Sequence, residues 1–163
     1  MDDEILATIQ ASGPRRAFGV GVLGALGVIL IYVALSQPPA NLFWGVFLVV
    51  IGGGALWAGF RMWDATQSRI ELTETQLRTS DGTLIADVAD ILSLDRGMFA
   101  FKPSNGFMLR LKNKTPRRWW PGLWWSLGNR VGVGGVTSAA HTKAMAEIIS
   151  AMIAQRAQDD AGG

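Results

Sequence analysis

The chain of 163 residues contains no cysteine, one histidine and one tyrosine. Without cysteine it forms no disulfide, no thiolate-based zinc or iron–sulfur site and no thiol nucleophile. The lone His141 has no serine and carboxylate partners in a recognisable pattern, so the sequence argues against a hydrolase triad. We therefore predict that the protein is not an enzyme and that it holds no cofactor and no metal.

Charged residues are also scarce, at 17% of the chain, and they are missing altogether from two long segments. Residues 17–35 and 42–60 each form an uncharged, apolar run of 19 residues. A helix that crosses a bilayer needs about 20 such residues, so both runs predict transmembrane helices. The alternative, two buried core helices, would need more surrounding chain than remains. We predict a transmembrane helical hairpin over residues 17–63, without the ionisable groups of a proton relay.

The charges beside these runs predict their orientation. Arg15 and Arg16 precede the first run, Arg61 follows the second, and the connecting segment 36–41 has no charge. Because basic residues concentrate on the cytoplasmic side, both termini are expected in the cytoplasm, with the hairpin in a bacterial inner membrane.

Two interpretations concern the residues before the first run. Residues 1–16 are expected to form a cytoplasmic N-terminal segment, in which Asp2-Asp3-Glu4 favours the start of a short helix that lies on the membrane or on a partner. Alternatively, Arg15-Arg16 resembles a twin-arginine export signal. Export would leave nine uncompensated positive charges outside the cell, which disfavours this alternative.

Small residues recur at four-residue spacing within the two apolar runs. This spacing lets helix backbones approach closely in a bilayer. The stripes either join the two helices to each other or accept a helix of an integral membrane partner, and the second run offers Ala55 and Gly59 as an alternative frame. The candidate helix-packing residues are Ala17, Gly21, Ala25, Gly54 and Ala58.

Residues 66–157 read as an antiparallel β domain that ends in a helix. Asp81-Gly82 predicts a hairpin turn. A final amphipathic helix is expected over 138–156, with Met145, Ile149 and Met152 on one face, followed by a tail at 158–163. The predicted fold class is α+β, a small sandwich or barrel capped by this helix. The expected strands are 69–73, 76–80, 83–85, 91–95, 98–101, 107–112 and 130–136.

The β domain resembles a known family. Residues 69–78, 81–85 and 88–91 are similar to the opening strands of bacterial pleckstrin-homology-like domains, through their apolar positions, the Leu72-Thr73 pair and one glycine turn. Domains of this family often follow a pair of membrane helices, and a C-terminal helix caps their sandwich. The resemblance implies a membrane-anchored binding or scaffolding role, and it supplies no catalytic residue.

The most unusual segment is a loop expected at 113–128. No acidic residue occurs between Asp95 and Glu147, although nine basic residues do. Tryptophan rings favour the headgroup layer and basic side chains favour an anionic inner leaflet. The loop is therefore interpreted as a lipid contact, as a protein-binding hot spot, or as a loop that folds back onto the sandwich. The candidate contact residues are Arg117, Arg118, Trp119, Trp120, Trp124 and Trp125.

These features predict an accessory function. The hairpin is expected to pack against integral membrane partners in a larger complex, such as a respiratory or photosynthetic one. The β domain is expected to bind a partner protein or the lipids of the inner leaflet, and not nucleic acid. A free-standing lipid-binding sensor is the alternative, and a membrane-surface enzyme is the least favoured reading.

Overall fold

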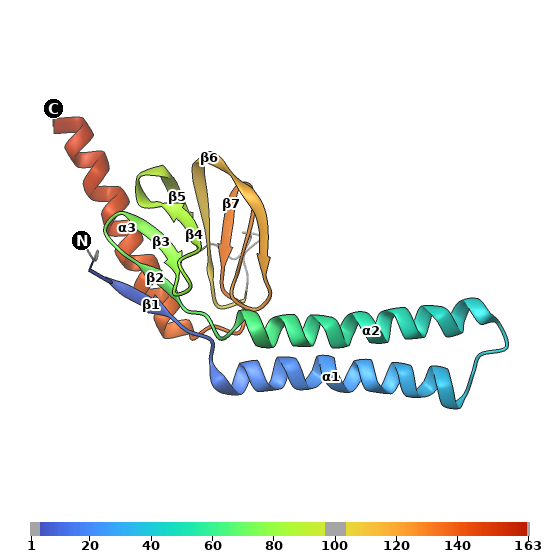
Figure 1. The fold of residues 1–163 in the computed structure, drawn as a ribbon. Coiled ribbons are helices and arrows are strands. Elements are labelled where there is room, and N and C mark those ends of the chain that lie inside the picture. Colours follow the sequence, from blue (N-terminus) through green and yellow to red (C-terminus); the bar gives the residue numbers. More distant parts are fainter. Residues whose placement is uncertain (1–3, 97–103, 163) are drawn as a thin grey trace.

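The computed structural model describes residues 4–96 and 104–162, which form an α+β fold (Figure 1). The class is as predicted, and the expected strand at 98–101 lies outside the described residues. The elements in chain order are β1 (Ala7–Ile9), α1 (Gly13–Ser36), α2 (Leu42–Ala65), β2 (Ile70–Leu72), β3 (Gln76–Thr79), β4 (Leu84–Asp87), the 3-10 turn η1 (Val88–Asp90), β5 (Ile91–Asp95), β6 (Phe107–Trp120), β7 (Trp124–Val133) and α3 (Ala139–Gly162).

Helices α1 and α2 lie side by side and project from the rest of the molecule (Figure 1). We call them the helix pair. Each has 24 residues and contains an 18-residue stretch with a mean hydropathy of 2.5 in α1 and 1.9 in α2, so both are long and apolar enough to cross a membrane. They contain the predicted spans 17–35 and 42–60 and extend beyond them. Asn41 begins α2 because its side-chain oxygen accepts a hydrogen bond from the Phe43 amide at 2.9 Å.

Glycines bring the two helices into close contact, but mostly not the ones that were expected. A Cβ at Gly27 would lie 2.8 Å from the Gly52 carbonyl oxygen, and one at Gly52 would lie 3.0 Å from the Gly27 carbonyl oxygen. Ala55 and Gly59, the alternative frame, are buried. The candidates Ala17, Gly21, Ala25 and Gly54 are exposed, and Ala58 is half-buried. The predicted stripes therefore leave most of the contact within the pair to other residues.

The strands form two antiparallel sheets, which we call the β domain together with α3. Strands β1-β2-β3-β4 make one sheet in that order, and β5-β6-β7 make the other. Side chains from both sheets and from α3 share one core, which includes Ile70, Leu109, Trp124 and Met145. The predicted helix face is confirmed, since Met145 and Ile149 are fully buried.

The N-terminal segment corrects one prediction. Instead of starting a helix, Ala7–Ile9 forms strand β1, which pairs with β2 in the register Ala7 to Leu72 and Ile9 to Ile70. Ile9 is fully buried in the core, so pairing here removes its side chain from water as well as satisfying its backbone. The β domain thus begins before the helix pair, and not at residue 66 as expected.

The prediction of a loop at 113–128 is also wrong. Strands β6 and β7 run through it and are joined by a short turn at 121–123. Register shifts after Arg110 and Thr115 bend the two strands, so that they arch and return their turn toward the helix pair (Figure 1). There the Leu123 carbonyl accepts from the Gly134 amide at 2.8 Å, which ties the turn to the chain just after β7.

The final helix starts at Ala139, one residue later than predicted. It is nevertheless longer than predicted, because it continues through most of the expected tail to Gly162. Its second half is fixed by Arg156. The guanidinium of Arg156 donates to the carbonyl oxygens of Ala89 at 2.8 Å and Val88 at 2.9 Å, and the Val88 carbonyl also accepts from the Ile91 amide that caps η1. These bonds hold α3 against the start of β5.

The predicted Asp81-Gly82 turn is confirmed, and it yields a test. Gly82 has a φ of 87°, and the Asp81 carboxylate accepts from the Thr79 hydroxyl and from the Thr83 amide. The Thr79 hydrogen bond is the main cause that lowers the pKa of Asp81. A lowered pKa means that the carboxylate stabilises the fold above its unfolded-state pKa of about 3.9 and loses this effect as the pH falls further.

Asp81→Asn is therefore expected to lower the free energy of unfolding at pH 7 by less than about 1 kcal/mol, since an amide accepts these bonds more weakly. The gap between variant and wild type should close below about pH 4. Thermal unfolding in detergent across this pH range measures both effects. A gap that stays constant with pH would contradict the role of the charge.

Candidate functional site

The β domain is attached to one end of the helix pair by several direct contacts. The Ser12 amide donates to the Val136 carbonyl at 2.7 Å, and Ala11 forms a β-bridge with Thr137. The 121–123 turn lies against the end of α2, because a Cβ at Gly122 would lie 3.3 Å from both Met62 and Thr66. The last turn of α2 and the first of α1 therefore carry the domain without a long linker.

The four tryptophans of the β6–β7 turn do not form one surface. Trp119 is 51% exposed, and its ring lies 6.5 Å from that of Trp57 on α2. Trp124 is 1% exposed in the core, and Trp120 stacks on it at 5.1 Å. Trp125 covers Gly132, where a Cβ would lie 2.5 Å from the indole. Only Trp119 of the four keeps half of its side-chain surface exposed.

Basic residues accompany the tryptophans at this end of the helix pair. The Arg16 guanidinium lies 3.9 Å from the centre of the Trp63 ring, and the Arg61 guanidinium lies 6.0 Å from that of Trp57. Arg117 is exposed. Arginine and tryptophan therefore lie together at this end of the helix pair, but the arginines in contact with rings come from the helix ends and not from the predicted segment.

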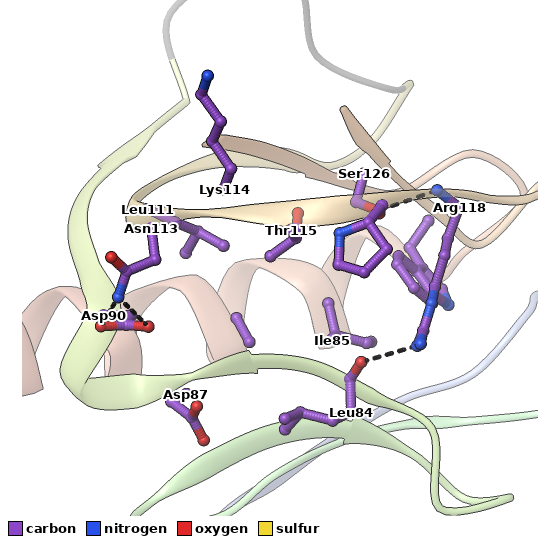
Figure 2. Close-up of a pocket in the computed structure, with 13 residues that line it drawn as sticks. Leu84, Ile85, Asp87, Asp90, Leu111, Asn113, Lys114, Thr115, Arg118 and Ser126 are labelled. Carbon is purple, nitrogen blue, oxygen red and sulfur yellow. Dashed lines mark hydrogen bonds between the residues drawn. The ribbon is translucent and has the colours of Figure 1, made fainter. Parts of the chain in front are cut away.

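Arg118 has a different position, in a cleft between the two sheets. The cleft has a volume of about 330 Å³ and follows the length of β4 on one side and the second half of β6 on the other. Figure 2 shows Arg118 extending from β6 to β4, where its guanidinium donates to the Leu84 carbonyl at 3.3 Å. Asp87 and Asp90 lie toward the other end. Buried side chains line the cleft, namely Ile85, Leu111, Trp124 and Ser126.

Among the described residues, both long walls of the cleft are strand edges without a neighbouring strand. Within residues 4–96 and 104–162, strand β4 is the last strand of its sheet and pairs only with β3. Strand β5 pairs with β6 only as far as Leu111, so beyond that residue β6 pairs with β7 alone. Unpaired edges of this kind accept the main chain of an added strand.

The two ends of the cleft carry opposite charges. Asp90 accepts two hydrogen bonds from the Asn113 amide, both at 3.1 Å, and Asp87 is exposed beside it. Arg118 supplies positive charge toward the other end. Lys114 is the other basic residue among the described residues of the lining, and it points away toward the rim (Figure 2). The cleft is thus a groove with an apolar floor, with two carboxylates toward one end and the Arg118 guanidinium toward the other.

Sequence reasoning missed this cleft. Its walls come from segments that are distant in the chain, and the bend in β6 that separates them has no clear sequence pattern. Arg118 was predicted as a contact residue for lipid or for a partner protein, and not as a residue that spans two sheets. Among residues 4–96 and 104–162, no three histidine, aspartate or glutamate side chains come close enough together to hold a metal ion.

The chain matches no protein-family model, no curated protein and no solved structure. The exposed tryptophan beside α2 and the charged cleft are therefore interpreted from their own residues.

Proposed function

We propose that this protein is a non-enzymatic, membrane-anchored docking protein, an accessory subunit of a larger complex in a bacterial inner membrane. The helix pair sits in the bilayer and the β domain lies at its cytoplasmic face. The cleft between β4 and β6 takes an extended segment of a partner protein. The observation that carries this proposal is the pair of unpaired strand edges that face each other across the cleft.

The surface of the helix pair supports the membrane placement. Only 11% of the most apolar 18-residue stretch of α1 and 17% of that of α2 are buried, so most of the large side chains of these helices are exposed. Leaving so much apolar surface in water would be costly, whereas lipid tails accept it. The arginines at the domain end, with none in the far loop, favour a cytoplasmic β domain.

The chemistry of the cleft defines the kind of partner segment. An extended chain between β4 and β6 would give its main-chain groups to one or both edges, as in β-strand addition. Its apolar side chains would meet Ile85 and Leu111. A basic residue would lie toward Asp87 and Asp90, and an acidic residue or a terminal carboxylate would lie toward Arg118. An occupant with this order of charges satisfies both ends.

A lipid-binding scaffold is the second candidate, and Trp119 favours it. With the helix pair in a bilayer, Trp57 lies one helical turn inside Arg61, so Trp119 reaches the interfacial layer where tryptophan is favoured. The order of sheets and terminal helix also supports our proposal that the domain is pleckstrin-homology-like. This surface and the cleft are distinct, so lipid contact orients the domain while the cleft binds protein.

Site-specific photo-crosslinking in native membranes tests the docking function. A photoreactive residue at Lys114, on the rim of the cleft, is expected to crosslink to one defined segment of one partner, identified by mass spectrometry of the crosslinked peptide. The control is the same residue at Lys143, which is exposed on α3 away from the cleft. Equal crosslinking from both positions, or none from Lys114, would contradict the proposal.

A blocking variant sharpens the test. Leu84 is 42% exposed at the cleft and Leu92 is 53% exposed on β5 outside it, so tryptophan at either position is accommodated at the surface. Leu84→Trp is expected to reduce crosslinking from Lys114 by about fivefold or more, because it fills space that the partner needs, whereas Leu92→Trp should not. An equal effect of both variants would argue that the cleft is not the binding site.

A further inference from the structure

A second cavity lies where the β domain meets the end of α2. It has a volume of about 260 Å³ and is formed by four separate parts of the chain: the last turns of α2, the link to β2, the β3–β4 turn and the end of β6. Its lining residues are Arg61, Asp64, Ala65, Gln67, Ser68, Asp81 and Trp120.

One face of α2 connects this cavity to the apolar surface of the helix pair. Trp57, Arg61 and Asp64 are spaced by four and three residues, so they lie on the same face of the helix. The ring of Trp119 approaches this face at Trp57, where both tryptophans are about half exposed. Moving along α2 from the helix pair toward the β domain, one meets a tryptophan pair, then a cation, then carboxylates.

The charges in the cavity are incompletely matched by the protein. Within the described part of the chain, the Asp64 carboxylate has neither a hydrogen bond nor an ion pair, and Arg61 has no ion pair. Asp81 is held by the Thr79 hydroxyl and the Thr83 amide. The cavity therefore presents one free cation and one free anion, with a second carboxylate beside them.

We propose that this cavity binds the headgroup of a zwitterionic phospholipid with a primary amine, such as phosphatidylethanolamine. The phosphate pairs with Arg61, and the ammonium donates hydrogen bonds to Asp64 and Asp81. The acyl chains then run along the helix face past Trp57 and Trp119. This inference rests on the membrane placement in the proposed function, which puts Arg61 at the level of the headgroups.

The charge count selects this class of lipid over others. An anionic headgroup would bring a negative charge to two carboxylates with only one arginine to offset them. A choline headgroup carries the right charges, but its quaternary ammonium has no hydrogen to donate to a carboxylate. An ethanolamine headgroup supplies both an anion for Arg61 and donors for the aspartates.

Native mass spectrometry of the full chain in detergent tests the inference. Phosphatidylethanolamine, phosphatidylcholine and phosphatidylglycerol with identical acyl chains are added in equal amounts. The ethanolamine lipid is expected to be retained about fivefold more than either of the others. Asp64→Asn should abolish this preference, while Arg61→Gln should reduce retention of all three. Asp160→Asn, an equal change of charge on exposed α3 outside the cavity, is the control.

Two results would overturn the inference: equal retention of the three lipids, or the same loss of preference in Asp64→Asn and Asp160→Asn. Carbonate extraction of native membranes separates this failure from failure of the proposed function. A protein that resists extraction but shows no lipid preference has the anchor without the headgroup site. A protein released by carbonate lacks the anchor, which refutes both proposals.

Discussion

Replacing Trp124 with alanine is expected to lower the free energy of unfolding by about 3–5 kcal/mol, the usual cost of removing a fully buried tryptophan. Its side chain is 1% exposed, belongs to the core shared by both sheets and α3, and stacks on Trp120. For a chain of this size the loss corresponds to a fall in melting temperature of about 10 °C or more. Thermal unfolding in detergent, followed by far-UV circular dichroism, measures it.

Two matched variants isolate the cause. Trp124→Phe keeps an aromatic ring and removes an indole N–H that is buried without a hydrogen-bond partner among the described residues, so it should cost clearly less than alanine. Trp119→Ala changes the same residue type on the neighbouring strand β6, but at a 51% exposed position, and should leave the melting temperature nearly unchanged. If Trp119→Ala were as destabilising as Trp124→Ala, the assignment of one ring to the core and the other to the surface would be wrong.

The second large effect is expected in the helix pair, at Gly52. Gly52→Ala places a methyl group 2.8 Å from the Ile31 side chain, which is closer than atoms tolerate, and 3.0 Å from the Gly27 carbonyl oxygen, which is tighter than most contacts of this kind. The backbone oxygen has little freedom to move, so the helices must separate. Overpacking of this kind costs about 1–3 kcal/mol. Titration with SDS in mixed micelles, followed by loss of helicity, should show an earlier transition.

The adjacent residue is a close control. Gly53 has the same helix propensity as Gly52, but a Cβ there would meet nothing within 4 Å. Gly53→Ala should therefore leave the transition unchanged or slightly later, because alanine is the better helix former. Equal and large effects of the two variants would mean that helix propensity, and not the contact with α1, controls the stability of the pair.

The sequence predicts the parts of this fold whose signal is local. The helix pair follows from two uncharged runs, and the β3–β4 turn follows from Asp81-Gly82. The buried face of α3 follows from the spacing of Met145 and Ile149. In each case the deciding interactions lie within a few residues of each other, so that periodicity or turn chemistry is sufficient.

The errors occur where distant segments decide the structure. Residues 7–9 become a strand only because β2 lies beside them, some sixty positions later in the chain. The fate of Trp119 and Trp124 depends on the bend in β6, since composition alone makes both candidates for a surface. The cavity that we propose binds a lipid headgroup also combines α2 with the link to β2, the β3–β4 turn and the end of β6, and no sequence motif marks it. The composition of residues 113–128 identified this segment as unusual, whereas the pairing of distant strands determined which of its side chains are buried and which are exposed.

The pairing of β1 with β2 has a consequence for how the protein is made. Strand β1 leaves the ribosome before the two helices, and its neighbour β2 emerges only after both helices have been synthesised. If the helices enter a membrane as they emerge, the first strand must wait unpaired until the hairpin returns the chain to the same side. The pairing of β1 with β2 then completes the sheet after the hairpin has been inserted. A fragment that starts after α2 would lack this strand and would expose the edge of β2, so it should aggregate more readily than the full chain.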